Sequence, residues 1–388
     1  MSELANLFQR VERDLQRRGT DAEQSHPAAL WRRLVQLRER AEHGDTSDAE
    51  LVGAARELAS ETGGDTAEIP ADRLVQTLDA AIRAPSLHNS QPWRFAVGAG
   101  HVDVRLDPAR QLDVADPDRS AARLACGAAI HNLTLAFPVL LRRDAAVTLL
   151  PDRADPDLIA RIRPGRARPA TPHERAGYAA IGRRRTNRYP FRDDTPVHHG
   201  HHWTLSEAAR TEHGWLTVIT EATRRRQIAA MVADADTALS TNAAYRAELA
   251  SWVRPDAETT DGVPPAAAGI RSEDGDLLRG RDYGGRTRRP GRDFEAEPLL
   301  AVIGGAGDRA VDEITVGRAL QAVLLAATEA GLAVSVYSQP FEVPAVRARM
   351  RRFTDRLGTP YLVLRIGYAS RPSPATPRRP VETVTDLR

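Results

Sequence analysis

Two short stretches of this 388-residue chain hold residues whose types and spacing could bind a ligand. The first, PSLHNSQPWRF over residues 85–95, holds short polar side chains between two prolines. Prolines restrict the backbone and small polar residues bond locally, so such a loop can present N–H groups to a ligand at little entropic cost. The second, RRRTNRYPF over residues 183–191, places arginines four residues apart around a threonine. Guanidinium groups with paired donors can form a fork for a phosphate monoester.

Taken alone, each stretch also has an ordinary structural interpretation. The first could be a simple connection between a helix and a strand. The second could be the basic end of a helix, which the helix dipole favours. The residue types by themselves leave these alternatives open.

Apolar spacing predicts the elements that position both stretches. Leu74, Leu78 and Ile82 recur at helical spacing, and Pro85 ends that helix. Two strands joined at glycines follow over residues 93–106, and an almost wholly apolar helix runs from Ser120 through Leu133. Further strands are predicted at 146–150, 214–220, 299–303 and 332–337, a last strand at 361–366, and helices at 173–181, 315–330 and up to 357.

Composition excludes several kinds of chemistry. The 54 residues counted as Lys or Arg are all arginine, which rules out a Schiff-base lysine, a P-loop lysine and a Ser–Lys pair. Any phosphate must therefore be held by arginine, backbone N–H groups or helix ends. Cys126 is the only cysteine, so neither a disulfide framework nor a thiolate metal cluster can form within the chain, and a small buried residue is expected there.

Charge and hydropathy set further expectations. The net charge is +2, which gives no general sign of a nucleic-acid partner. No apolar run is expected to reach transmembrane length and the polar N-terminus does not resemble a signal peptide, so we predict a cytoplasmic protein without a membrane partner.

The histidines offer two candidate sites. His198, His199, His201 and His202 surround one glycine and could bind a metal ion, although a solvated loop is the favoured interpretation. His131, on the apolar helix, could be a general base, but a core or interface role is favoured there.

The run over 85–95 resembles the PSxxNxQPW segment of the nitroreductase flavoproteins, and is most similar to their Acg-type actinobacterial branch. Residues 184–191 are similar to the RxSxR motif with which that family binds the phosphate and ribityl chain of FMN. The segment 335–339 resembles the part that lies against the reactive edge of the flavin, and a basic residue in the tail completes the phosphate site. The resemblance implies an FMN site built from Pro85, Ser86, Leu87, Asn89, Gln91, Arg184, Thr186, Arg188, Ser335, Tyr337, Ser338, Gln339 and Arg378 or Arg379.

The order of the motifs adds a prediction about architecture. In ordinary members the arginine motif precedes PSxxNxQPW, whereas here it follows. GAAI at 127–130 also matches GRAL at 317–320, an offset of 190 residues. We therefore predict an α+β, nitroreductase-like fold in which two half-units are fused as a pseudo-dimer with one flavin site. The expected parts are a three-helix extension (1–66), a first half (71–165) and a second half (175–388) with a lid-like insertion (253–297).

The implied activity is that of an FMN oxidoreductase. Hydride would pass from NAD(P)H to flavin N5 and on to a small organic acceptor such as a nitro compound, a quinone or a natural product undergoing dehydrogenation. No catalytic residue is assigned, although His88 and Tyr337 could donate a proton. Alternatives are a flavin-sequestering protein closed by the lid and an interaction protein using residues 1–66, which could also dimerise an otherwise monomeric chain. A short RGG-like piece over 279–286 points only faintly to RNA.

Overall fold

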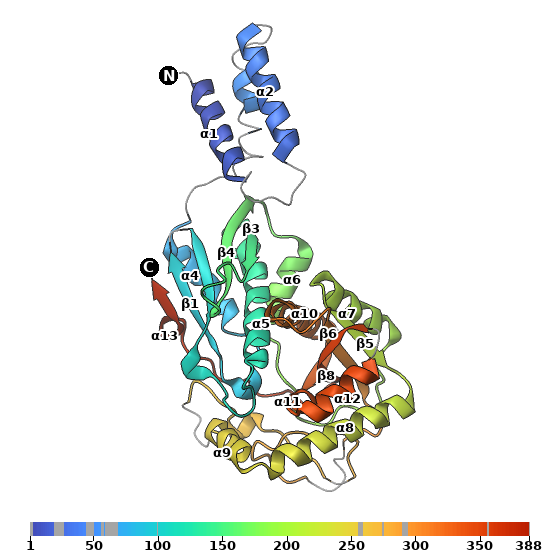
Figure 1. Cartoon of the computed structure of the whole chain (residues 1–388). Helices are drawn as coiled ribbons and strands as arrows, with labels where there is room; N and C mark the ends of the chain where they lie inside the picture. The colour runs from blue at the N-terminus through green and yellow to red at the C-terminus, as the bar shows by residue number, and fades with distance from the viewer. Residues whose placement is uncertain are drawn as a thin grey trace. The chain divides into compact units, whose positions relative to one another are not determined.

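The computed structural model describes residues 3–18, 27–43, 50–55, 58, 69–98, 100–254, 259–273, 275–288, 294–354 and 357–387. The chain divides into two compact units (Figure 1). The first is 1–68 with 165–168, and the second is 69–164 with 169–388. The two predicted halves therefore belong to one compact unit.

The first unit is helical. It contains α1 (Glu3–Arg18) and α2 (Pro27–His43), and residues 50–55 and 58 of the third predicted helix are also helical. Because the apolar residues recur at helical spacing, they meet on one side, where Val11, Leu34, Leu37, Leu51 and Leu58 form a buried cluster.

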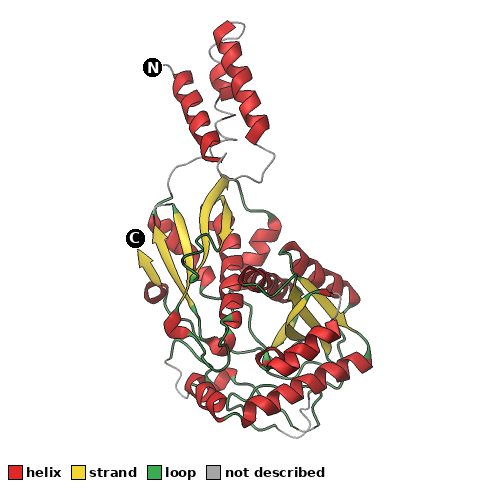
Figure 2. Cartoon of the chain, viewed as in Figure 1, coloured by secondary structure: helices red, strands yellow, loops and turns green. Residues whose placement is uncertain are grey.

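The second unit contains two sheets (Figure 2). One has the order β3-β4-β2-β1-β9 and the other the order β5-β6-β8-β7. The first sheet consists of β1 (Trp93–Gly98), β2 (His101–Leu106), β3 (Arg143–Leu149), β4 (Leu158–Ala167) and β9 (Thr385–Leu387). The second consists of β5 (Trp215–Ile219), β6 (Leu299–Gly305), β7 (Ala333–Tyr337) and β8 (Thr359–Gly367).

The strand predicted at 361–366 is present as β8, but it is not the last strand of the chain, because β9 follows it and pairs in parallel with β1. A three-residue strand is too short to show an alternating pattern. Through this pairing the C-terminal tail returns from the second sheet to the first. The arginines of the tail therefore lie within reach of the loop that precedes β1.

The helices of the second unit pack around a central pair, α5 and α10 (Figure 1). The helices are α4 (Ala71–Ala81), α5 (Ser120–Ala136), α6 (Pro172–Ile181), α7 (His199–Thr211), α8 (Ala222–Thr241), α9 (Ala243–Trp252), α10 (Ala310–Glu329), α11 (Gln339–Glu342), α12 (Pro344–Thr354) and α13 (Val381–Val384).

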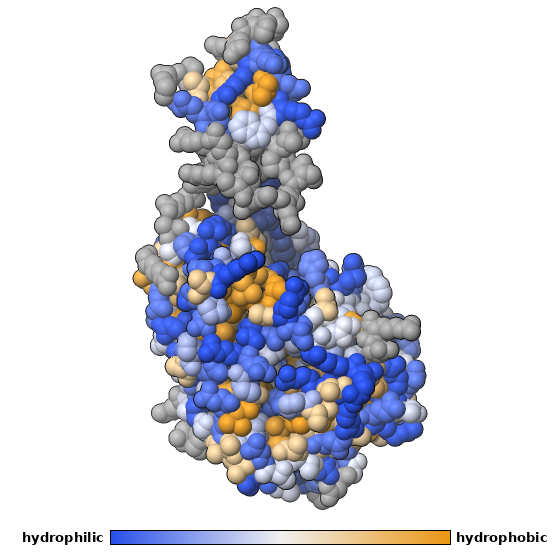
Figure 3. Space-filling view, in the orientation of Figure 1, coloured by the Kyte–Doolittle hydropathy of each residue, from blue (hydrophilic) through white to orange (hydrophobic). Residues whose placement is uncertain are grey.

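Helix α5 corrects the expectation that no apolar run reaches transmembrane length. Together with the π-helical turn Phe137–Leu141 it gives 22 residues, and its most apolar window has a mean hydropathy of 1.7. That window is 78% buried inside the protein, as in the core helix of a globular fold. On the face drawn in Figure 3, hydrophilic groups cover most of the described surface.

The contact between α5 and α10 has the symmetry of a dimer interface. A Cβ atom on Gly127 would lie 2.1 Å from the carbonyl oxygen of Ile314, and one on Gly317 would lie 2.0 Å from that of Leu124. Both pairs are related by the offset of 190 residues. Such a reciprocal contact is what a two-fold axis produces in an isologous dimer. This reciprocal contact is consistent with the predicted fusion of two half-units.

A buried polar pair fixes the register of the same helices. The amide of Gln321 on α10 donates to Oδ1 of Asn132 on α5 at 2.8 Å. Asn132 donates in turn to the carbonyl of Ala80 on α4 at 2.8 Å. Because a buried amide without a partner is costly, these bonds favour one alignment of the three helices. The chain just after α4 forms the first wall of the site.

Candidate functional site

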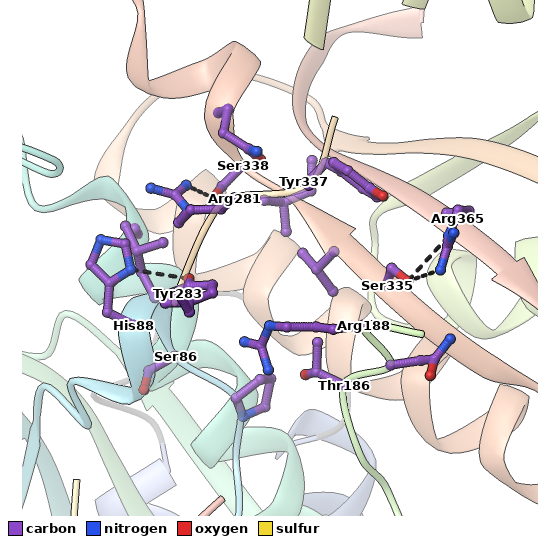
Figure 4. Close-up of a pocket in the computed structure, with 18 of the residues that line it drawn as sticks. Ser86, His88, Thr186, Arg188, Arg281, Tyr283, Ser335, Tyr337, Ser338 and Arg365 are labelled. Carbon is purple, nitrogen blue, oxygen red and sulfur yellow. Dashed lines mark hydrogen bonds between the residues drawn. The ribbon is translucent and has the colours of Figure 1, made fainter. Parts of the chain in front are cut away.

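A cavity in the second unit is lined by both predicted halves and by the lid-like segment (Figure 4). Its open volume, mouth included, is about 1090 Å³. Apolar walls come from Leu124 on α5, from Ile270 and Phe294, and from Val336 on β7. Nine predicted site residues line it: Pro85, Ser86, Leu87, Thr186, Arg188, Ser335, Tyr337, Ser338 and Gln339.

The loop after α4 has an unusual backbone. His88, Asn89 and Gln91 have φ angles of 53°, 57° and 53°, in the left-handed region that residues other than glycine seldom adopt. The hydroxyl of Ser86 accepts a hydrogen bond from the backbone N–H of Gln91 at 2.9 Å, which braces the loop. Several such conformations in one loop persist only where the surroundings impose them, and they are concentrated at ligand sites.

Asn89 and Gln91 do not line this cavity but fasten its walls together. Asn89 Nδ2 donates to the carbonyl oxygens of Gly262 at 2.9 Å and Pro377 at 3.0 Å. Gln91 Nε2 donates to the carbonyl oxygen of Thr260 at 2.9 Å. The loop therefore holds both the lid-like segment and the C-terminal tail in place.

The second motif runs as an extended segment past the cavity. Thr186 forms a parallel bridge with Val334 of β7. Thr186 and Arg188 line the cavity, whereas Arg184 lies at a neighbouring pocket.

Two arginines meet at the far end of this segment. Arg184 is 6% exposed, and its Nη2 approaches the carbonyl oxygen of Arg83 at 3.5 Å. Arg378 donates to the same oxygen at 3.4 Å, to that of Ala84 at 3.1 Å and to Oδ1 of Asn89 at 2.9 Å. Arg184 from the second motif and Arg378 from the tail therefore meet at the start of the first loop.

Among the described residues, no carboxylate forms a hydrogen bond or an ion pair with either arginine. Nε and Nη1 of Arg184 and Nε of Arg378 are buried without a hydrogen-bond partner there. Burial, with Arg185 and Arg188 nearby, lowers the pKa of Arg184 to about 10. Burial and the proximity of Arg184 likewise lower the pKa of Arg378 to about 9. Buried cations without a counter-charge are costly, so the geometry calls for an anion between them.

The structure does not bring Arg379 to this cluster. Its guanidinium pairs with Asp107 at 3.3 Å, and its backbone N–H donates to Oε1 of Gln91 at 2.9 Å. Of the two tail arginines predicted as alternatives, Arg378 is the one that joins Arg184.

Comparisons with known proteins identify the family of this chain. The sequence model of the nitroreductase family matches residues 65–180. The "putative NAD(P)H nitroreductase acg" of Mycobacterium tuberculosis is 31% identical over 335 residues, which cover 82% of this chain and 97% of that protein. The chain belongs to the nitroreductase family. The "uncharacterized protein Rv3127" of the same organism is 31% identical over 79% of this chain and 91% of its own length.

Solved nitroreductases cover about half of the chain. A nitroreductase with bound FMN from Desulfitobacterium hafniense matches 53% of this chain and 94% of its own, with 16% identity and a TM-score of 0.33. In this nitroreductase-family chain the family model ends at residue 180, just before the arginine segment. The resemblance inferred from the motifs is confirmed at the level of the family.

Sequence reasoning did not pick out two further arginines of the cavity. Arg365 on β8 donates to Ser335 Oγ at 3.1 Å, lies over the rings of Phe191 and Phe294 and pairs with Glu295 at 3.0 Å. Arg281 pairs with Glu342 at 2.5 Å and donates to Ser338 at 3.1 Å. The sequence signal for Arg365 was its position as a lone arginine inside the apolar run of β8. Since Arg281 is already paired, it does not support the RNA interpretation.

His88 and Tyr283 form another polar contact in the cavity. His88 Nδ1 lies 3.1 Å from the Tyr283 hydroxyl, and the Arg188 guanidinium lies 4.8 Å from the centre of the Tyr283 ring (Figure 4). Burial, followed by the charges of Arg281 and Arg188, holds the pKa of His88 well below its ordinary value of 6.5. His88 is therefore neutral at pH 7.

This lowered pKa predicts a loss of stability in acid. Below pH 6.5 the unfolded chain protonates His88 while the folded protein does not, so the free energy of unfolding falls as pH falls. The slope from this group is about 1.4 kcal/mol per pH unit until the folded pKa is reached. Urea unfolding at pH 7.0, 6.0 and 5.0 should show a smaller acid loss in His88→Gln than in the wild type. Parallel pH dependences in the two proteins would contradict this.

The remaining predicted candidates lie elsewhere. His131 binds Glu212 at 2.9 Å, which fits the interface role, and burial raises the pKa of the Cys126 thiol. The favoured loop interpretation of the histidine cluster was wrong: His198 is the N-cap and His199, His201 and His202 begin α7. The side chain of His198 accepts a hydrogen bond at the N-terminus of α7, and the residues that follow favour a helix, so α7 begins at this point. Within the described residues no cluster of His, Cys, Asp or Glu has metal-binding geometry.

Proposed function

We propose that this chain is an FMN-dependent oxidoreductase that takes hydride from NAD(P)H and reduces a small organic acceptor, such as a nitro compound or a quinone. Dehydrogenation of a natural product is a variant of the same chemistry. The observation that carries the proposal is the buried pair Arg184 and Arg378, which has no counter-charge among the described residues and lies next to a partly apolar cavity. The names of the relatives point the same way, since they are called putative NAD(P)H nitroreductases.

The residues present fit FMN from end to end. Arg184 and Arg378 would hold the phosphate, which supplies the missing anion. Thr186 and Arg188 would contact the ribityl chain and the near side of the ring system. Ser335 to Gln339 would lie along the reactive edge, where backbone and side-chain donors can hydrogen-bond to ring heteroatoms. When bound, FMN accepts and donates hydride.

The protein's own contribution is placement and exclusion of water. Leu124, Ile270, Val336 and Phe294 give the cavity apolar walls, which strengthen the polar contacts inside it. Arg365 fixes the hydroxyl of Ser335 by a hydrogen bond, so this donor is oriented before a ligand arrives. The cavity is lined from both fused halves, so one chain can form a complete site.

The ratio of flavin to protein tests this proposal. Protein saturated with FMN and freed of excess ligand should retain close to one FMN per chain. Retention of two would contradict the single site, and failure to bind FMN at micromolar concentrations would contradict the proposed function. The acceptor, the cytoplasmic location and the role of residues 1–66, including dimerisation, stay predictions.

A second candidate function is that of a protein that holds flavin with little turnover. The hydrogen bonds and ion pairs that hold the lid-like segment in place favour it. Asp261 lies between Arg110 at 2.6 Å and Arg254 at 2.9 Å, next to the groups that bind Asn89 and Gln91. Burial alone would raise the pKa of Asp261, but hydrogen bonds from these arginines hold it below its ordinary value. Its carboxylate therefore stays charged, and so paired, near neutral pH.

Substitution of this aspartate separates the two functions. In Asp261→Ala the lid-like segment loses both ion pairs, so trypsin should cut the 259–288 region several-fold faster. Asp234→Ala, which removes an exposed ion pair with Arg349, should leave the cutting rate unchanged. If NADPH reduces bound FMN rapidly only in Asp261→Ala, the wild type is a flavin-holding protein. Rapid reduction in the wild type favours the reductase.

A further inference from the structure

The charged side chains that line the cavity are all arginines: Arg188, Arg281 and Arg365. Among the described residues, no aspartate or glutamate lines it. His88 adds no charge at pH 7, because its pKa lies well below 6.5. Arginine keeps its positive charge in proteins, so the wall of the cavity is positive wherever a carboxylate does not offset that charge from outside the lining.

Arg365 is held firmly in this wall (Figure 4). It is 2% exposed, and its guanidinium carbon lies 4.4 Å and 4.9 Å from the centres of the Phe191 and Phe294 rings. Its Nε and Nη2 donate to Ser335 Oγ at 3.3 Å and 3.1 Å, and Nη2 also donates to the carbonyl oxygen of Tyr189 at 2.8 Å. These contacts fix the position of the charge relative to the cavity.

The carboxylate that offsets Arg365 belongs to the lid-like segment. Oε1 of Glu295 lies 3.0 Å from Nη1 of Arg365. Oε2 accepts a hydrogen bond from the backbone N–H of Phe191 at 2.9 Å, which keeps the carboxylate in place. Glu295 is 7% exposed and does not line the cavity. The lid-like segment therefore supplies a negative charge beside a positive charge of the cavity wall.

We infer that Glu295 of the lid-like segment lowers the reduction potential of the bound flavin by offsetting the charge of Arg365. The inference rests on the proposed function, which places FMN in this cavity. Hydride from NAD(P)H carries two electrons and one proton, so reduced flavin has one more negative charge than oxidised flavin until it takes up a second proton. A positive charge in the wall favours the reduced form, and a carboxylate beside that charge opposes it. Neither side chain has to contact the flavin, because Coulomb interactions act across several ångströms in a site of low dielectric constant.

Two substitutions with opposite expected effects test this inference. Glu295→Gln keeps the shape of the side chain and an oxygen acceptor for the Phe191 N–H but removes the negative charge, whereas Arg365→Met removes the positive charge. Relative to oxidised FMN, reduced FMN should bind about tenfold more tightly to Glu295→Gln and about tenfold less tightly to Arg365→Met than to the wild type. For a two-electron couple, tenfold corresponds to about 30 mV in midpoint potential, upward in the first variant and downward in the second.

The midpoint potential is measured by anaerobic titration of FMN-loaded protein with dithionite against a reference dye at fixed pH, so the test needs no turnover. The double variant, Arg365→Met with Glu295→Gln, should return to within about twofold of the wild-type binding ratio, because the two charges are removed together. Asp103→Asn is the control. It removes a buried carboxylate of the first sheet that pairs with Arg161 at 2.6 Å and does not line the cavity, so the potential should not change.

An ion pair with only a structural role would give a different pattern. Loss of packing weakens the binding of oxidised and reduced flavin alike, so the midpoint potential would not move. An unchanged potential in Glu295→Gln, or shifts of the same sign in the two single variants, would overturn the inference and leave the proposed function standing, since FMN is still bound. If Arg365→Met does not fold because Glu295 is left unpaired, Glu295→Gln and the double variant decide the outcome. Protein that binds no FMN would contradict the proposed function and the inference with it.

Discussion

Replacing Arg184 by methionine should abolish retention of FMN and at the same time stabilise the FMN-free protein. Methionine keeps much of the side-chain volume but removes a buried cation that has no counter-charge among the described residues. Removing a charge-assisted bond to phosphate costs about 1.5–3 kcal/mol, or roughly 10- to 150-fold in affinity. Removing an unpaired buried charge is expected to raise the free energy of unfolding without ligand by about 1–3 kcal/mol. Arg378→Met should behave in the same way.

Arg379→Ala is the matched control, because it changes a neighbouring arginine that already has a carboxylate partner, Asp107. It should lower the thermal midpoint and leave FMN affinity within about threefold of the wild type. Fluorescence titration with FMN and urea unfolding of the flavin-free proteins measure the two effects. If Arg184→Met lowers both affinity and flavin-free stability, the arginines are ordinary structural residues and the phosphate lies elsewhere.

Alanine at Gly127 or Gly317 should prevent the fused halves from packing. Alanine favours a helix over glycine by about 1 kcal/mol, so propensity alone predicts stabilisation. The new Cβ atom, however, would lie 2.1 Å or 2.0 Å from a backbone carbonyl oxygen of the opposite helix. Backbone cannot move aside as a side chain can, so we expect a loss of at least about 3 kcal/mol in the free energy of unfolding.

Gly182→Ala provides the control for this substitution. Gly182 ends α6 with φ of −67°, and a Cβ atom there meets nothing within 4 Å. Alanine at this position should be neutral or stabilising by a few tenths of a kcal/mol. Chemical unfolding followed by circular dichroism compares the three variants. Stability within 1 kcal/mol of the wild type for Gly317→Ala would mean that the helices cross elsewhere.

Motifs and periodicity predicted much of this site. The residue types between Pro85 and Pro92 left a ligand loop and a simple connection open, and the resemblance to the PSxxNxQPW segment favoured the ligand loop. The spacing of Arg184, Thr186 and Arg188 predicts a group of donors for a phosphate, and in the structure Thr186 and Arg188 line the cavity while Arg184 lies at a neighbouring pocket. The repeat around Gly127 and Gly317 predicts two related helices because helix packing demands small residues at a close crossing.

The features of the site that could not be predicted depend on contacts between residues far apart in the sequence. Nothing local shows that Arg378 joins Arg184 while Arg379 turns to Asp107, since the choice depends on how β9 pairs with β1. Tyr283 lies in a segment without regular periodicity, so its bond to His88 has no sequence signal. Asn89 and Gln91 belong to the recognised motif, but their role as fasteners of the lid-like segment and the tail depends on chains distant in sequence.

The most direct test of the account is the visible spectrum of the FMN-loaded protein during anaerobic titration with NADPH. The flavin spectrum of the proposed oxidoreductase should bleach fully with one NADPH per flavin. The spectrum of the oxidised flavin should return when a quinone is added. A bound flavin that dithionite bleaches but NADPH does not would contradict a working reductase and favour the flavin-holding protein. A chain that takes up no FMN at all would contradict both.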